Sequence, residues 1–534
     1  MRTRHLGGLA IVVLAGFGPA WAQTHTHGVA RLGTVEFKVD CSPTAQQQFH
    51  TAMALYHSFA WPQAVAAFRA IATTDPACGM AQWGVAMSLL GNPFAWPAGL
   101  TPERLNEITA ALDAARAAGL RTDRERDYVE AVRVFLRDHA GTPHAQRLQA
   151  FDTAMAQVAA RHPDDVEAAI LSALITSANF NPADKTYANQ LKAAGILEPL
   201  YKKYPNHPGI AHYLIHSYDY PAIANKGLDA AKAYARIAPD AAHALHMPSH
   251  IFTRVGYWKE SIAANRESAR VAGDATFDGH HASDYLVYAH LQLAQDEAAR
   301  QAMQHSFRLK PVDNLGASFA YAAMPARITL ERGDWAGAAN LALTPSADAY
   351  PWQKYPQAEA TNAFARGIGA ARSGNAAGAR QQQARLVALR DAAKEAKLTY
   401  WMGQIDIQAA VIGALALCAE GKPAECVEGL KAAATREDAT EKHVVTPGPL
   451  VPARELLAEM LLAENRSPEA LREYEAVMAK EPNRYRAIAG AMAAAHRAGD
   501  QAKARALASE LLKLGGEADT PRPSLQEARR ITGG

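Results

Sequence analysis

The chain has little cysteine and no excess of charge of either sign. Only 4 of its 534 residues are cysteine, and 55 lysines and arginines stand against 53 aspartates and glutamates. A neutral balance without basic blocks argues against nucleic acid or an anionic membrane surface as partner. The few cysteines suit disulfides in an oxidising compartment.

Familiar catalytic motifs are also missing. The sequence has no GxSxG, P-loop, HExxH, CxxC or GxGxxG in a suitable context. No strand-like alternation stands out except Gly33 to Val39, which predicts a short extended segment lying against the first helical unit. Beyond the N-terminal region we expect no apolar stretch that approaches the length of a membrane-spanning helix, and hence no membrane insertion.

The first 22 residues have the pattern of a secretory signal peptide. Arg2 and Arg4 precede an apolar run from Leu6 to Phe17, and Ala20-Trp21-Ala22 fits a small-x-small cleavage site. The run is too short to span a bilayer, and no cysteine follows directly to carry a lipid anchor. Cleavage near Ala22 predicts a periplasmic or secreted protein.

One short pattern recurs along the chain. It first appears as Ala60-Trp61-Pro62-Gln63-Ala64, followed by Phe68, Ile71 and Asp75-Pro76. Similar turns with an aromatic or alanine partner begin at Gly256, Leu293, Arg332, Gly374, Ser467 and Gly499. This pattern resembles the 34-residue helix–turn–helix unit of the tetratricopeptide-repeat (TPR) superfamily. With its signal peptide, the chain resembles an exported bacterial-type member with a histidine-rich groove.

The resemblance covers most of the chain and implies the fold. It predicts an all-α, right-handed solenoid of helical hairpins with an N-terminal extended arm. The expected parts are a signal peptide (1–22), the arm (23–44), an N-terminal solenoid (45–311), middle repeats (312–443), a C-terminal pair (444–515) and a flexible tail (516–534). Such repeats usually build binding surfaces, so the resemblance says little about function.

Placing the repeats also predicts the cysteine pairing. Cys41 lies just before the first helix of the first hairpin and Cys78 just after its second, and both ends of a hairpin lie together. Cys418 is late in one helix and Cys426 early in the next, across a tight turn. We expect disulfides Cys41–Cys78 and Cys418–Cys426, each worth about 2–4 kcal/mol.

Histidine is concentrated in one part of the chain. Nine of the 20 histidines lie between His207 and His290. Pro205 and Pro239 are 34 residues apart and have the place of prolines that end a unit. Counting from them, and from the turns at Gly256 and Ala294, predicts that successive units begin at Pro208, Ala242 and His280.

This register places the polar residues on one face of three successive helices, because they recur every three or four residues. That face lines the concave groove in TPR proteins. Neighbouring helices would bring His212, His246 and Asp284 into one row, and His216, His250 and Tyr288 into another. Imidazole and carboxylate are ligands for Zn, Cu, Fe or Ni. The predicted metal ligands are His212, His216, Asp219, His243, His246, His250, His281 and Asp284.

A related sequence in the next unit changes the chemistry. Met247-Pro248-Ser249-His250 returns as Met324-Pro325-Ala326-Arg327, so arginine replaces histidine at the same position. This predicts an anion-binding Arg327 beside the cluster, with Tyr288 as a further ligand-binding residue. Pro248 inside the helix is a possible distortion that would displace His250.

Other residues are weaker candidates. We expect His57 to serve packing or capping, and Glu455 to be solvated unless it faces the groove. Gln23-Thr24-His25 would form a Cu(II)- or Ni(II)-type site only with a free amino terminus.

Three functions remain open at this point. The first is an exported protein that binds a transition metal or small polar ligand in its groove. The second is a scaffold that binds an extended peptide or protein partner there. The third is a metal-dependent enzyme with an open coordination position and Tyr288 as proton donor. Histidine packed only for structure is the alternative to all three.

Overall fold

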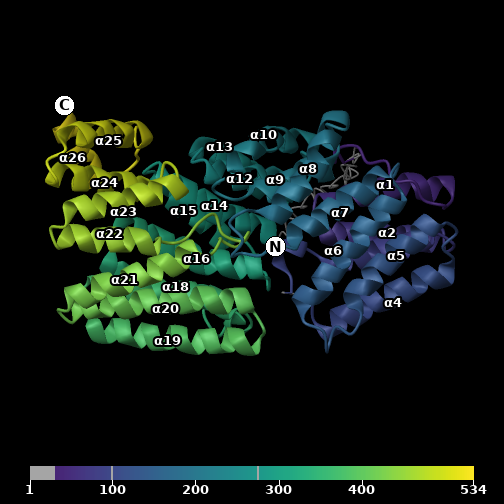
Figure 1. Ribbon diagram of the computed structural model, residues 1–534, viewed down its shortest axis with the longest axis horizontal. Helices are drawn as coiled ribbons and strands as arrows, with labels where there is room; N and C mark the ends of the chain where they lie inside the picture. The colour runs from purple at the N-terminus through teal and green to yellow at the C-terminus, as the bar shows by residue number, and fades with distance from the viewer. Residues whose placement is uncertain (1–29, 98–99, 274–275, 534) are drawn as a thin grey trace, which may run out of the picture.

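A computed structural model describes residues 30–97, 100–273 and 276–533 (Figure 1). Within these ranges the chain forms helices and turns and no strand. The expected all-α array of helical hairpins is therefore confirmed. The predicted signal peptide (1–22) and Gln23-Thr24-His25 lie outside the described residues.

Six hairpins make up the first half of the array. They are α1 (Pro43–His57) with α2 (Trp61–Thr74), α3 (Gly79–Leu90) with α4 (Pro102–Ala118), α5 (Asp123–Leu136) with α6 (His144–Arg161), α7 (Val166–Ala178) with α8 (Ala188–Lys203), α9 (Pro208–Tyr218) with α10 (Leu228–Ile237), and α11 (Ala242–His246) plus α12 (Pro248–Arg254) with α13 (Trp258–Ala272). Short 3-10 turns stand at η1 (Pro93–Ala95) and η2 (Ala224–Gly227).

Six further hairpins and a last helix complete it. They are α14 (Phe277–Gln292) with α15 (Asp296–Arg308), α16 (Leu315–Arg332) with the short α17 (Trp335–Ala339), α18 (Pro356–Arg372) with α19 (Ala376–Glu395), α20 (Thr399–Ala419) with α21 (Pro423–Asp438), α22 (Ala453–Ala463) with α23 (Ser467–Lys480), α24 (Tyr485–Arg497) with α25 (Gln501–Leu514), and α26 (Pro523–Thr532). The 3-10 turn η3 (Trp352–Lys354) precedes α18.

The helices of the histidine-rich stretch begin close to the predicted positions. Helix α9 begins at Pro208 and α11 at Ala242, as the register predicts. Helix α14 begins at Phe277, three residues before the expected His280. Proline at the first helical position of α9 and α12 fits because its missing N–H has no partner in the first turn.

The N-terminal arm packs Leu32, Val35 and Phe37 into the core, and most of its other described residues are exposed. Phe37 is fully buried, with its ring centroid 5.4 Å from that of Phe49, 5.7 Å from Trp83 and 5.2 Å from Tyr128. These three rings belong to α1, α3 and α5. Arg31 forms an ion pair with Asp240 at 2.8 Å. The arm therefore contacts several hairpins, where the sequence predicted contact with the first unit alone.

A second non-helical segment packs against helices of the other half. Residues 439–452, between α21 and α22, lie beside α14 and α16 (Figure 1). Glu441, Val445, Thr446 and Val451 of this segment are buried. An extended segment without ladder partners must satisfy its polar groups elsewhere. Side chains of the surrounding helices do this, as when Arg327 donates to the Thr446 hydroxyl at 2.9 Å.

The C-terminal hairpins fold back onto the middle of the chain. Trp258 Nε1 donates to the carbonyl of Asn483 at 2.8 Å. Buried Arg522 forms an ion pair with Asp296 of α15. The flexible tail predicted for 516–534 is wrong over its described residues, because α26 packs Leu525 and Ala528 into the core. Two prolines near the end suggested disorder, whereas Pro523 begins the helix.

The apolar core is divided into two large clusters. One runs from Leu32 to Phe252 and the other from Ala294 to Ala528. Three small clusters lie between them, on α13 to α16 and the turn before α18. The buried histidines come at the end of the first cluster, so a polar centre lies where the apolar core is interrupted.

One described helix has the length and composition of a membrane span. Helix α20 has 21 residues and is apolar enough to cross a membrane, contrary to the expectation that no later stretch approaches this length. Half of the apolar stretch of this helix is buried in the protein. It packs against α18, α19 and α21, as a core helix does.

Both expected disulfides are present. Cys41–Cys78 links the start of α1 to the end of the hairpin it forms with α2, and its Cα atoms are 4.9 Å apart. Cys418–Cys426 joins α20 to α21 with Cα atoms 5.3 Å apart. Both separations lie in the range that an unstrained bridge requires.

Candidate metal centre

The six predicted histidines come together in two trios. We call His212, His216 and His243 the first trio, and His246, His250 and His281 the second. In each trio one ring nitrogen per residue lies within 4.8 Å of the others. All six rings are buried. The rows expected from the register are thus rearranged, because His243 and His246 stand on the same short helix and serve different trios.

Hydrogen bonds from neighbouring side chains orient two rings of the second trio. Nδ1 of His250 lies 2.8 Å from Asp219 Oδ2, and Nδ1 of His246 lies 2.6 Å from Asn265 Oδ1. The Asn265 amide nitrogen donates to the Ser261 carbonyl at 2.8 Å, which identifies the other atom as oxygen. Both partners accept, so both Nδ1 atoms carry the proton.

The remaining nitrogens of these two rings face each other. Nε2 of His246 and Nε2 of His250 lie 3.0 Å apart. With their protons on Nδ1, neutral rings present two lone pairs at this short distance. Two nitrogens bound to one ion at about 2.0–2.1 Å would have a comparable separation. A cation between the two atoms resolves the repulsion.

His281 and Tyr285 complete the surroundings of the second trio. His281 has a buried Nδ1 without a hydrogen-bond partner. The hydroxyl of Tyr285 lies 3.4 Å from His250 Nε2 and 3.3 Å from the Val444 carbonyl, so it has two acceptors to choose between. Burial raises the pKa of Tyr285 well above its usual value, which keeps the hydroxyl protonated.

The first trio is organised in a similar way. His212 Nδ1 donates to the His57 carbonyl at 2.6 Å, which leaves a lone pair on Nε2. His243 Nε2 lies 3.2 Å from that atom, and His243 Nδ1 is buried without a partner. His216 has no hydrogen-bond partner on either ring nitrogen and stacks on Phe94 with ring centroids 3.9 Å apart.

Pro248 changes the helix without removing His250 from the centre. The predicted single helix is divided into α11 and α12 at Met247. Pro248 takes the first position of α12, where a missing N–H costs nothing. The possible displacement of His250 therefore does not occur, and its ring remains beside that of His246 with centroids 4.9 Å apart.

Asp219 lies behind the ligand shell in a buried charge cluster. Arg254 Nε donates to its Oδ1 at 2.8 Å and Lys442 Nζ donates to its Oδ2 at 3.1 Å. Burial raises the pKa of Asp219, but Lys442, Arg254 and His250 outweigh it and hold that pKa well below its usual value. Asp219 is therefore a carboxylate that orients His250.

Burial also favours neutral rings throughout the centre. It is the largest cause that lowers the pKa of each histidine in both trios, and five of the six pKa values fall well below the usual one. Neutral imidazole is the form that binds metal ions. The centre is thus prepared to offer lone pairs near neutral pH.

A cavity of about 630 Å³ reaches both trios. His216 and His243 of the first trio and His250 and His281 of the second all line it. Its remaining wall includes His443 and Val445 of the segment between α21 and α22. A small molecule in this cavity could contact residues of either trio.

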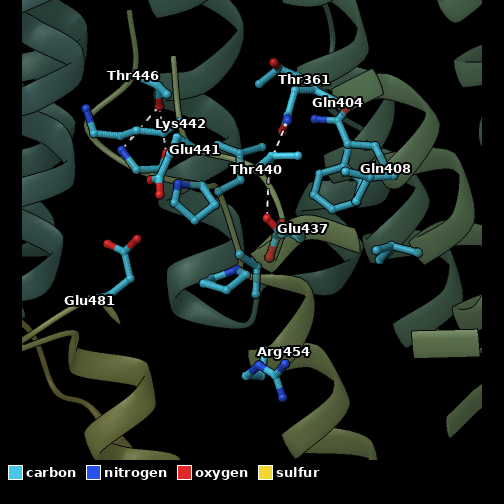
Figure 2. A pocket seen from close by; sticks show the side chains of 18 of the residues that line it. Thr361, Gln404, Gln408, Glu437, Thr440, Glu441, Lys442, Thr446, Arg454 and Glu481 are labelled. Atoms are coloured by element: carbon cyan, nitrogen blue, oxygen red, sulfur yellow. Dashed lines mark hydrogen bonds between the residues drawn. The ribbon is translucent and has the colours of Figure 1, made fainter. Parts of the chain in front are cut away.

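The same segment borders a second, smaller cavity. Figure 2 shows this space, with Glu441, Lys442 and Thr446 on one side and Gln404 and Glu437 from neighbouring helices. Gln404 donates to the Thr440 hydroxyl at 3.1 Å. The segment therefore lines both cavities, and the Lys442 side chain forms an ion pair with Asp219.

The structure does not bring Asp284, Tyr288 and Arg327 to the histidine trios. Asp284 pairs with Arg327 at 2.7 Å, and both side chains are buried. Arg327 lies over the ring of Tyr288, 4.9 Å from its centroid, and the Tyr288 hydroxyl accepts from Arg484 at 3.2 Å. Asp284, predicted as a metal ligand, and Tyr288, predicted as a proton donor, thus belong to an internal network of arginine contacts instead.

Glu455 belongs to the same kind of network. It is fully buried and pairs with Arg484 at 2.6 Å, so the expectation of a solvated carboxylate is wrong.

Several residues of the centre escaped sequence reasoning. His57 was expected to serve packing, yet its carbonyl orients His212, and its ring contacts Glu167 at 3.0 Å. Glu167 also contacts His207 at 2.9 Å. Asn265 and Lys442 lie on a second helix and on a non-helical segment, and the helix-face pattern gave no signal for either.

Comparison with known proteins leaves the chain without an assigned family. Its sequence matches no protein-family model and no curated protein. Among solved structures, Naa15/Naa10 bound to HypK is similar with a TM-score of 0.25 and 12% identity, covering 91% of this chain and 72% of that one. The TPR domain of P58(IPK) gives a TM-score of 0.21 and 11% identity, covering 86% of this chain and 99% of that one. Likenesses this weak carry no argument about function.

Proposed function

We propose that this protein binds a first-row transition-metal ion at His246, His250 and His281. The observation that carries the proposal is the 3.0 Å approach of two Nε2 atoms whose rings both hold their proton on Nδ1. A bound ion accepts both lone pairs and removes the repulsion between them. His281 supplies the third nitrogen.

The surroundings of the rings support a ligand role. Metal-binding histidines commonly donate their second N–H to a carboxylate or carbonyl, which fixes tautomer and ring orientation. Asp219, Asn265 and the His57 carbonyl take this place for His250, His246 and His212. Three histidines held in this way exceed what packing alone requires.

The donor set narrows the choice of metal. Imidazole nitrogens suit Zn, Cu, Fe and Ni, whereas Ca²⁺ and Mg²⁺ prefer oxygen ligands. No carboxylate of the described residues joins either trio. Zinc, copper, iron and nickel are therefore the proposed ions.

A metal-dependent enzyme is the second candidate, and the adjoining cavity favours it. Catalytic metal sites keep a coordination position open for water or substrate. The cavity at His250 and His281 offers space for such a ligand. For the enzyme, Tyr285 replaces Tyr288 as the candidate proton donor, because its hydroxyl lies 3.4 Å from His250 Nε2.

The peptide-scaffold alternative ranks lower. An extended peptide was expected along the helix faces that carry the predicted site, but residues 439–452 of the chain itself form hydrogen bonds there with Tyr285 of α14 and Arg327 of α16. A protein or peptide partner would need another part of the surface.

Metal analysis of the purified full chain tests the proposal. After incubation with Zn(II), Cu(II) or Ni(II) and desalting, we expect at least one equivalent of metal per chain. His246→Gln combined with His250→Gln should remove one equivalent. His290→Gln is the matched control, because His290 is also buried but its ring forms a hydrogen bond with Gln295 and belongs to neither trio. Metal content unchanged by the double variant would reject the site.

We also propose that the protein is exported to an oxidising compartment. The pattern of residues 1–22 and the two disulfides support this. Fractionation of the native host and N-terminal sequencing should find a mature chain beginning near Gln23. A full-length chain in the cytosol would contradict the proposal.

A further inference from the structure

We propose that the centre holds two metal ions side by side, one in each trio, and that a small anionic oxygen donor such as hydroxide joins them. This inference rests on the proposed metal binding at the second trio. It adds a second ion at His212, His216 and His243, and it names the class of ligand that the cavity accepts.

His216 is the first reason to place an ion in the first trio. Its side chain is only 3% exposed, yet neither ring nitrogen has a hydrogen-bond partner. An imidazole buried without partners loses the hydrogen bonds that water would give it, and this loss destabilises the folded state. A metal ion bound to one of its nitrogens supplies the missing interaction.

His212 and His243 complete the donor set. The His57 carbonyl directs the lone pair of His212 Nε2 away from α1 and toward His243. A neutral His243 could satisfy this lone pair by donating from Nε2. That arrangement still leaves His243 Nδ1 and both nitrogens of His216 without partners. A hydrogen-bonded network therefore gives a partner to one ring pair, whereas an ion would bind one nitrogen of each of the three rings.

The two trios are close enough to act together. Ring centroids of His216 and His250 are 6.0 Å apart, as are those of His243 and His246. Each of these pairs contains one histidine of the first trio and one of the second. Ions that bind to such neighbouring rings lie within reach of one bridging ligand, as in two-metal sites generally.

The cavity gives a bridging ligand access to both ions. Two histidines of each trio line the same space of about 630 Å³. A ligand in this space could therefore contact both trios. His443 and Val445 of the segment between α21 and α22 line the same space.

The charge of two bound metal ions favours an anionic bridging ligand. The six imidazoles are neutral donors, and the nearby carboxylates are already paired: Asp219 with Arg254 and Lys442, and Asp284 with Arg327. Two buried dications would therefore lack a compensating charge from the protein, which is costly in a low-dielectric interior. A hydroxide or another small oxygen anion supplies part of that charge.

Stoichiometry separates this inference from the proposed function. We expect the full chain loaded with Cu(II) to retain two ions. The variant His216→Gln/His243→Gln and the variant His246→Gln/His250→Gln should each retain one, while His290→Gln retains two. One ion in the native chain, lost only from the second-trio variant, would overturn this inference and leave the proposed function standing. No ion in the native chain would overturn both.

Electron paramagnetic resonance tests the bridge in the native chain, so it does not depend on the folding of variants. Two Cu(II) ions that share a hydroxide couple magnetically, and the signal per copper of the native chain should fall at least severalfold below that of a mononuclear Cu(II) standard. A native signal per copper equal to that of a mononuclear Cu(II) standard would show two separate ions and overturn the bridge. Circular dichroism melts identify any variant that has lost its fold.

Discussion

Asp219 Oδ2 accepts the Nδ1–H of His250 at 2.8 Å, and the carboxylate thereby fixes which nitrogen of that ring carries the lone pair. The sequence placed Asp219 among the metal ligands. In the structure Asp219 contacts the His250 ring at Nδ1, on the side away from His246. It positions this ligand and pairs with Arg254 and Lys442.

Replacing Asp219 with Asn should weaken metal binding without removing a ligand. An amide can present nitrogen or oxygen to His250, so the tautomer is no longer fixed. Loss of such outer contacts typically lowers affinity about 10–100-fold. Competition with a chelator of known affinity measures the change. Asp152→Asn is the control, since Asp152 is equally buried but accepts a hydrogen bond from the Thr176 hydroxyl. Native affinity in the Asp219 variant would count against the assignment.

Replacing Asp284 with Asn should affect stability and leave the metal content unchanged. Arg327 would lose its buried charge partner, which typically costs about 3–5 kcal/mol. Urea unfolding measures the loss, and metal analysis of the folded variant measures occupancy. The opposite result, lost metal with native stability, would restore Asp284 as a ligand.

The two disulfides should contribute unequally to stability. Cys41–Cys78 closes a separation of 37 residues and Cys418–Cys426 one of 8. Loop-closure entropy then predicts losses of about 4 and about 2.5 kcal/mol for the paired serine variants. Urea midpoints at equal pH check the order. A larger loss from the shorter loop would show that local packing outweighs chain entropy.

Glu437 makes stability depend on pH. Burial raises the pKa of Glu437 from 4.5 to about 7 in the folded protein. The folded state therefore binds this proton more tightly than the unfolded state, and stability falls as pH rises from 4.5 to about 7. Glu437→Gln keeps an oxygen that can accept the Ala453 N–H, and it should raise the urea midpoint at pH 8 but not at pH 4. Equal effects at both pH values would refute this cause.

The helix starts and the histidine cluster were predictable because their signals are local. Proline and turn patterns set the register, and a spacing of three or four residues puts His212 and His216 on one face. The same reasoning misplaced Asp284. A helix face shows which side chains point together but not which residue stands opposite, and Arg327 is that residue.

Contacts from distant segments were beyond sequence reasoning. Lys442 reaches Asp219 from a segment with no periodic pattern, 223 residues away along the chain. Arg522 pairs with Asp296 in the same manner, which turns an apparently loose tail into a packed helix. Neither pairing leaves a local trace in hydrophobic periodicity.

The segment between α21 and α22 has a consequence for the order of events during synthesis. Helices α9 to α14 leave the ribosome well before residues 439–452, and domains generally begin folding from the N-terminal end. Until that segment arrives, the histidine rings lack one wall of their cavity and Asp219 lacks Lys442. A chain in which this segment has not yet packed therefore has a more open centre than the finished molecule, wherever that folding takes place.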